Sequence, residues 1–106
     1  MYIADLHIHS SYSRATARDM DLDALSRWAT IKGIALLGTG DFTHPAWRAE
    51  LAAKLQPAGR GIYDYHGTRF ILTAEVSLIY PKAGKTRRVH MIIMAPDLAR
   101  ADEIAR

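Results

Sequence analysis

The 106-residue sequence contains no cysteine, which excludes a disulfide framework and any zinc site built from thiolates. It also lacks an apolar run long enough to cross a membrane and the pattern of a signal peptide, so we expect no membrane partner. Internal repeats and low-complexity tracts are missing as well. A chain without cysteine is compatible with a reducing compartment, and we predict a cytoplasmic protein.

Positive charge is only weakly in excess, with a formal net charge of +3 when histidine is counted as neutral. This balance permits an anionic partner such as nucleic acid but does not require one. Apolar residues make up 49% of the chain, which is normal for a globular protein and argues against disorder.

The hydrophobic pattern predicts strands that alternate with helices. Strands are expected at residues 2–9, 34–37 and 70–75, with extended segments at 78–80 and 87–95 joined by a basic turn at 81–86. Helices are expected from the N-cap Asp21 to the C-cap Gly33, from Pro45 to a break at 56–61, and after Asp97. The residues expected on their buried stripes are Leu22, Leu25, Trp28, Ala29, Ile31, Trp47, Leu51 and Leu55. Helices between apolar strands imply parallel pairing, so the predicted fold class is α/β.

Residue types that bind metals occur where these strands end. His7 and His9 lie two residues apart and therefore share one face of the first strand. In α/β barrels, catalytic groups project from the carboxyl ends of the strands into one pocket. The candidate metal ligands are His7, His9, Asp41, His44, Glu75 and His90, whereas His66 is assigned to a turn with Gly67. Alternatively, the first two histidines are only the polar face of a strand, and His90 is a hydrogen-bonded core residue.

Ligands of mixed histidine and carboxylate type suit zinc, manganese or iron better than calcium. Such ions lower the pKa of a bound water and hold the oxygens of a phosphoester during displacement. Arg14 could bind a phosphate or could be a solvated loop residue. The basic turn would suit a DNA backbone, or it is a solvated hairpin tip; its residues are Lys82, Lys85, Arg87 and Arg88.

The sequence resembles the PHP family, the polymerase and histidinol phosphatase domain. The resemblance rests on Asp5-Leu6-His7-Ile8-His9-Ser10, Thr39-Gly40-Asp41, Glu75-Val76-Ser77 and Val89-His90. It implies the N-terminal part of a distorted (β/α)7 TIM-like barrel that hydrolyses phosphoesters with two or three divalent ions, zinc or manganese. It further implies that His7 and His9 are ligands, that Glu75 bridges metals and that His90 is a further ligand.

Two positions depart from the usual pattern of that family. Asp41 is followed by Phe42 instead of histidine, and Arg14 lies where an acidic residue or histidine is common. With these departures, the chain is similar to the endonuclease Q branch, whose members nick DNA 5′ to deaminated bases such as uracil or hypoxanthine and at abasic sites. The resemblance therefore implies DNA as the partner.

Two other functions remain open, a phosphatase for small phosphomonoesters and a non-catalytic metal-binding module. The later motifs of the family, another histidine and an Asp-x-His, do not occur in this sequence. We therefore interpret residues 1–106 as the N-terminal portion of a PHP domain, expected to be inactive and poorly folded in isolation.

Overall fold

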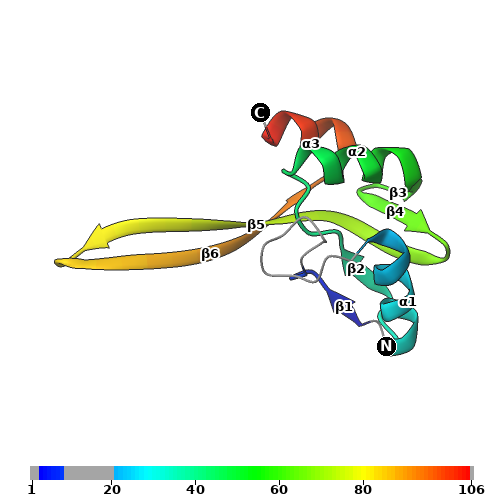
Figure 1. The fold of residues 1–106 in the computed structure, drawn as a ribbon, viewed down its shortest axis with the longest axis horizontal. Coiled ribbons are helices and arrows are strands. Elements are labelled where there is room, and N and C mark those ends of the chain that lie inside the picture. The colour runs from blue at the N-terminus through cyan, green and yellow to red at the C-terminus, as the bar shows by residue number, and fades with distance from the viewer. Residues whose placement is uncertain (1–2, 9–20, 106) are drawn as a thin grey trace.

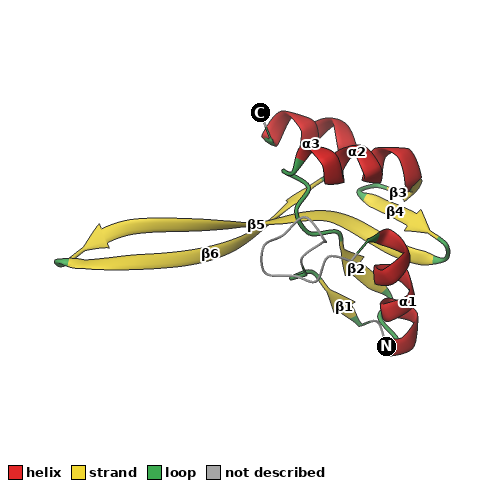
Figure 2. Cartoon of the chain, in the orientation of Figure 1, coloured by secondary structure: helices red, strands yellow, loops and turns green. Residues whose placement is uncertain are grey.

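The computed structural model describes residues 3–8 and 21–105 as a mixed α/β fold (Figure 1; Figure 2). Its elements are β1 (Ala4–Asp5), α1 (Leu22–Lys32), β2 (Leu36–Gly38), α2 (Pro45–Lys54), β3 (Gln56–Gly59), β4 (Ile62–Tyr65), β5 (Thr68–Lys82), β6 (Lys85–Ala95) and α3 (Leu98–Ile104). The described strands form a sheet in the order β1-β2-β5-β4-β3, and β6 pairs with β5 outside this row. The predicted α/β class is confirmed.

The centre of the sheet is parallel, as the sequence predicts. Leu36 of β2 pairs with Ala4 of β1 on one side and with Arg69 of β5 on the other, and both pairings are parallel. β4 pairs antiparallel with β5, and β3 pairs antiparallel with β4 at the edge of the sheet. The strands that the structure describes make an open sheet, so the expected barrel is only partly present.

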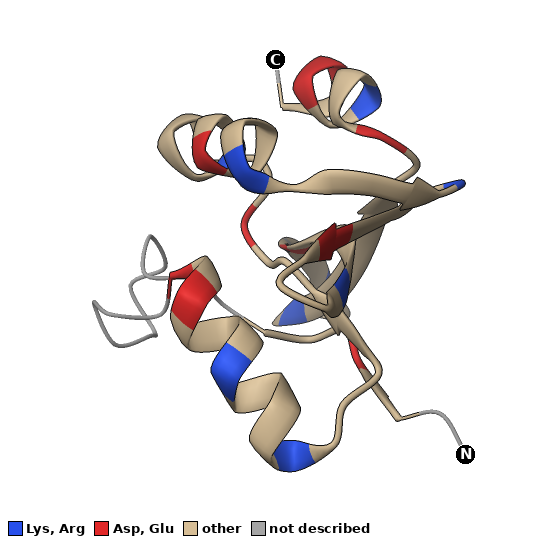
Figure 3. Cartoon of the chain, turned by 90° about the vertical axis from the view of Figure 1, so that its right-hand side faces the viewer, with Lys and Arg blue, Asp and Glu red and all other residues tan. Residues whose placement is uncertain are grey.

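The helix ends follow the predicted capping residues. The Asp21 carboxylate accepts a hydrogen bond from the backbone N–H of Ala24 at 2.9 Å, and Gly33 ends α1 in the left-handed conformation. The Asp97 carboxylate caps α3 through the N–H of Arg100 at 2.8 Å. Acidic residues lie near the start of α1 and basic ones toward its end, which complements the helix dipole (Figure 3).

All three helices pack on one side of the sheet. Ser26 of α1 lies 2.8 Å from Thr68 of β5, hydroxyl to hydroxyl, and the N–H of Leu98 of α3 donates to the Tyr63 hydroxyl at 3.0 Å. The β5 residues buried on this helix side are Thr68, Phe70, Leu72 and Ala74. They join one core with the helix residues Leu22, Leu25, Ala29, Trp47, Leu51, Leu55 and Ala101. Trp28 packs against this core as predicted, but Ile31 is 80% exposed and was wrongly placed on the buried stripe.

Two strand predictions need correction. The segment 56–61, predicted as a simple break, begins with β3 and turns into β4, so it forms a hairpin at the sheet edge. Within residues 3–8 strand pairing is limited to Ala4–Asp5, so His7 follows β1 instead of lying within it. No helix among the described residues is long and apolar enough to span a membrane.

The third correction concerns the segments 70–75 and 78–80, which belong to one 15-residue strand, β5. Together with β6 it forms a two-stranded ribbon that projects from the rest of the fold (Figure 1). Ala83 and Gly84 make the turn at its tip, and both have positive φ, as a type I′ hairpin turn requires. His66 and Gly67 make the same kind of turn between β4 and β5, which confirms the predicted turn and places His66 there.

Candidate functional site

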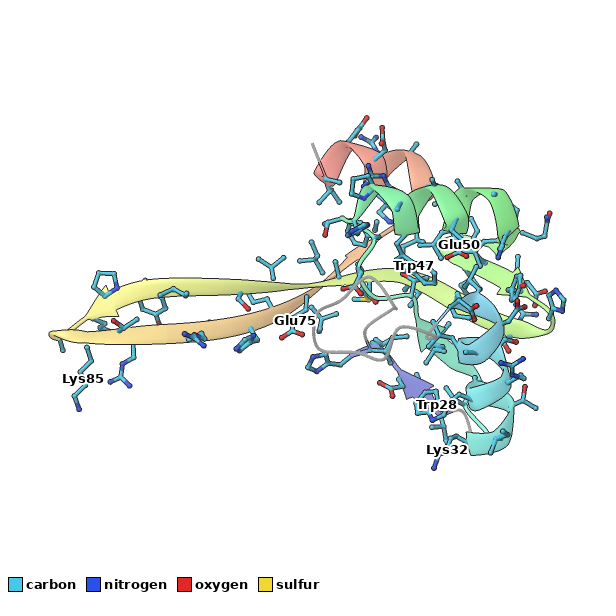
Figure 4. The ribbon with its side chains drawn as sticks, viewed as in Figure 1. Trp28, Lys32, Trp47, Glu50, Glu75 and Lys85 are labelled. Carbon is cyan, nitrogen blue, oxygen red and sulfur yellow. The ribbon has the colours of Figure 1, made fainter. Side chains whose placement is uncertain are left out.

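Glu75 lies on β5 where this strand leaves the parallel part of the sheet and enters the ribbon (Figure 4). Side chains alternate along a strand, so Glu75 points to the side opposite the helix side of Phe70 and Leu72. Its side chain is 16% exposed. The carboxylate is therefore largely enclosed, but it is open to solvent on one side.

Each carboxylate oxygen of Glu75 contacts one imidazole. His7 Nε2 lies 2.8 Å from Oε2, and His90 Nδ1 lies 2.8 Å from Oε1. The parallel pairing of β1, β2 and β5 brings His7 to a residue 68 positions later in the chain. His90 is brought there by the antiparallel register, in which it faces Ser77, two residues from Glu75. Two histidines and one carboxylate, from β5, β6 and the segment after β1, thus form a surface cluster.

The reading of His90 as a core residue is wrong. Its side chain is 53% exposed, and its neighbours Val89 and Met91 are exposed as well. The apolar run around it belongs to the projecting ribbon, not to the core. Ser77 Oγ lies 2.9 Å from His90 Nδ1 and shares that nitrogen with Glu75.

Among residues 3–8 and 21–105, no three His, Asp or Glu side chains converge on one point suited to a metal ion. Glu75 instead lies between two imidazoles, so that each of its oxygens and the imidazole nitrogen beside it form a separate pair of potential ligands. The candidates His9 and Arg14 lie outside the described residues.

The loop after β2 approaches the same region. The Thr73 hydroxyl accepts a hydrogen bond from the N–H of Gly40 at 2.9 Å, and the Thr73 carbonyl accepts one from the N–H of Phe42 at 3.2 Å. Both Gly40 and Asp41 have positive φ, so the chain turns sharply here. These contacts bind the loop to β5 two residues before Glu75.

The residues that follow differ in their surroundings. Phe42 is fully buried in the core, so the residue after Asp41 serves packing in this chain. His44 is exposed at the N-cap of α2, and its N–H donates to the Asp41 carbonyl at 2.9 Å. The indole N–H of Trp47 donates to the carbonyls of Thr39 and Gly40, which fixes α2 against the loop.

The basic residues of the ribbon lie near its tip. All four are exposed, and within the described ranges none forms an ion pair with a carboxylate: Lys82, Lys85, Arg87 and Arg88. The sequence between residues 76 and 96 contains no Asp or Glu. The charged side chains at this end of the ribbon are therefore all positive.

A cavity of about 460 Å³ lies elsewhere, between α1 and the turn from β4 to β5. Tyr65 at its wall donates a hydrogen bond to Asp23 at 2.5 Å. This bond lowers the pKa of the Asp23 carboxyl and raises the pKa of the Tyr65 phenol. None of the residues that line this cavity belongs to the Glu75 cluster.

Sequence reasoning did not assign roles to Thr73 and Ser77. Thr73 is buried and positions the Gly40–Phe42 loop, while Ser77 contacts His90. The sequence did offer a sign of these roles. Thr73 and Ser77 lie two positions before and after Glu75, and residues two apart on a strand point to the same face.

Comparison with known proteins found no matching family model. The chain is 32% identical over 100 residues to the uncharacterized protein MJ0043 of Methanocaldococcus jannaschii, covering 94% of this chain and 10% of that protein. Among solved structures it is similar to the lesion-specific endonuclease PfuEndoQ from Pyrococcus furiosus, with 34% identity and a TM-score of 0.80. It is likewise similar to an Endonuclease Q complex with a 27-mer duplex substrate that has an abasic lesion at the active site, with 36% identity and a TM-score of 0.80.

Both structural matches cover 96% of this chain and 24% of the matched chain. The described fold, including its curled sheet, therefore corresponds to a part of these endonucleases. The matches relate the chain to lesion-specific endonucleases.

Proposed function

We propose that this chain carries part of the metal-dependent phosphodiesterase centre of a DNA-repair endonuclease that nicks 5′ to deaminated bases. The observation that carries the proposal is the contact of each Glu75 oxygen with one imidazole, His7 after β1 and His90 on β6. A carboxylate held in this way can bridge two cations, one beside His7 and the other beside His90. The proposed ligand set is His7, His9, Asp41, His44, Glu75 and His90.

The distances place the potential ligand atoms side by side. Two ligand atoms on one tetrahedral zinc ion at about 2.1 Å lie roughly 3.4 Å apart. The two nitrogen–oxygen distances of 2.8 Å are hydrogen-bond lengths, so each imidazole would have to shift outward by about 0.6 Å to admit an ion. Histidine and carboxylate ligands suit zinc or manganese, and we propose two or three such ions. When bound, such ions lower the pKa of water and stabilise charge on phosphoryl oxygens.

The residues of the chain divide this work among them. Glu75, enclosed on the side of the strands, supplies negative charge between the proposed ions, and the more exposed imidazoles complete each pair. Ser77 Oγ contacts the same His90 nitrogen that faces Glu75, so this contact would be released when that nitrogen binds an ion. The cationic ribbon supplies the charge that attracts a phosphate backbone.

DNA that contains a lesion is the proposed substrate. The structural relatives are described as a lesion-specific endonuclease and as a complex with an abasic lesion at the active site. A small phosphomonoester would need no cationic ribbon that extends beyond the ligand cluster. We extend the proposal to deaminated bases and to abasic sites.

The test uses the protein expressed from its complete reading frame and duplex oligonucleotides that carry deoxyuridine, deoxyinosine or an abasic site. We expect one nick 5′ to the lesion, none in undamaged duplex, loss with a chelator and recovery with zinc or manganese. Glu75→Gln should lower the rate by more than the 10- to 100-fold that loss of an outer-shell partner costs. Hydrolysis of histidinol phosphate without cleavage of any damaged duplex would decide for a phosphatase, and inactivity on both would favour a non-catalytic module.

A further inference from the structure

The register of the β5–β6 ribbon assigns its side chains to two faces. Ser77 pairs with His90, and Ile79 pairs with Arg88, two residues further toward the tip. Residues two apart on a strand point to the same face. Arg88 therefore shares the face of Glu75 and His90.

The other three basic residues lie on the opposite face. Arg87 pairs with Tyr80, and Lys82 pairs with Lys85 beside the turn. Figure 4 shows Lys85 at the tip, at the far end of the ribbon from Glu75. The basic turn, which looks like one cluster in the sequence, is thus divided by the pleat of the ribbon.

We propose that Arg88 is a positioning residue that binds the phosphate next to the scissile phosphate. This inference rests on the proposed function, since it takes the Glu75 cluster as the place of cleavage. A step of two strand residues separates the Cα atoms of Arg88 and His90 by about 7 Å. A nucleotide chain carries a phosphate on every nucleotide. A strand whose scissile phosphate lies at the cluster can therefore present its next phosphate to Arg88.

The chemistry of Arg88 suits this role. A guanidinium group matches phosphate oxygens with two parallel hydrogen bonds. Arg88 is exposed and forms no ion pair within the described part of the chain, so binding would not have to break one. Arg87, its neighbour in sequence, has the same charge and exposure but points away from the cluster, which makes it a matched control.

The test combines protein variants with neutral phosphates in the DNA. Binding of the lesion duplex is measured by fluorescence anisotropy in chelator, where no cleavage occurs, and cleavage is measured with metal restored. The complete protein is compared as wild type, Arg88→Ala, Arg88→Lys and Arg87→Ala. Each is given duplexes with a methylphosphonate at one of the two phosphates that flank the cleavage position.

For wild type we expect about a 10-fold loss of affinity with one of the two methylphosphonates, the size expected for the loss of one hydrogen bond to a charged group. Arg88→Ala should bind unmodified DNA about 10-fold more weakly than wild type and should lose no further affinity when that methylphosphonate is present. Arg88→Lys should recover part of the affinity that Arg88→Ala loses on unmodified DNA. The loss of affinity caused by Arg87→Ala should instead add to the loss caused by either methylphosphonate, because Arg87 contacts neither phosphate. Metal content should stay unchanged in all variants.

If the loss of affinity caused by Arg88→Ala adds to the loss caused by the methylphosphonate at each of the two flanking positions, Arg88 binds neither phosphate. This result would overturn the role of Arg88 while leaving the proposed function intact. Full affinity and cleavage in Arg88→Ala would overturn it as well. Wild-type protein that cuts no lesion duplex would instead contradict the proposed function itself.

Discussion

Gly38 shows how a single residue controls the geometry of the candidate site. A Cβ atom at this position would lie 2.7 Å from the Thr73 hydroxyl oxygen and 2.9 Å from the Leu6 carbonyl oxygen. Glycine is needed for space, because its backbone is not in the left-handed region. The close approach of Leu6 to β2 places the next residue, His7, near Glu75.

Gly38→Ala should therefore destabilise the fold by about 1–3 kcal/mol, the usual cost of overpacking. The displaced Leu6 backbone should also separate His7 from Glu75 and lower metal binding. Urea unfolding monitored by circular dichroism gives the first effect, and elemental analysis gives the second.

Gly33→Ala is the control for this variant. Apart from its two chain neighbours, no atom of the described residues would lie within 4 Å of its Cβ, but its φ of 71° should cost about 1–2 kcal/mol through backbone strain alone. Metal content should not change. A Gly38→Ala protein with the stability and metal content of wild type would contradict the role of Gly38.

Individual residues were predictable from the sequence to different degrees. The caps Asp21, Gly33 and Asp97 were predicted because a cap depends on local chemistry alone. His90 was open to misreading because periodicity describes the neighbours along a strand, and these are apolar. Only the register shows that its strand leaves the body of the fold.

At the level of elements, the ribbon is the feature that sequence reasoning divided wrongly. Gly84 and the basic residues around it predicted the turn at its tip correctly. Ser77 and Pro81 suggested interruptions, but Pro81 lies one residue before the last pair of the ladder, where a missing donor costs little. Strand length was therefore underestimated, while the position of the turn was right.

A contact between two elements, α1 and β4, gives a prediction on pH dependence. The hydrogen bond from Tyr65 to Asp23 raises the pKa of the phenol above the ordinary value of about 10. Asp23→Ala should return this pKa toward that value. The ultraviolet absorbance of tyrosinate during an alkaline titration measures it, and Tyr65→Phe identifies the component that belongs to this residue.

The effect of this bond on stability has a defined sign. Because the pKa of Tyr65 is raised in the folded state, its contribution is present below pH 10 or so and is lost as the pH rises through the folded value. Because the pKa of Asp23 is lowered, its contribution is present above about pH 4 and is lost as the pH falls through the folded value. Identical tyrosinate titrations of wild type and Asp23→Ala would contradict this contact.

At the scale of the whole molecule, the helices and the candidate site occupy opposite sides of the sheet. The helix side is buried in one core, while Glu75 and His90 point the other way. A barrel wall with its helices outside would have this arrangement, and the chain corresponds to 24% of the endonucleases that it resembles. The sequence indicated the residue types of the site, but their pairing around Glu75 depends on contacts between β5, β6 and the segment after β1.

Metal content of Glu75→Gln tests the central proposal most directly. Glutamine keeps the size of the side chain but removes its charge and one of its two acceptor oxygens, so it cannot bridge two cations. Glu50→Gln is the control, because Glu50 lies on α2, where it pairs with Lys54 at 3.2 Å (Figure 4). In elemental analysis of the complete protein after dialysis, we expect wild type and Glu50→Gln to retain zinc or manganese and Glu75→Gln to lose most of it. A folded Glu75→Gln protein with the metal content of wild type would contradict the metal centre.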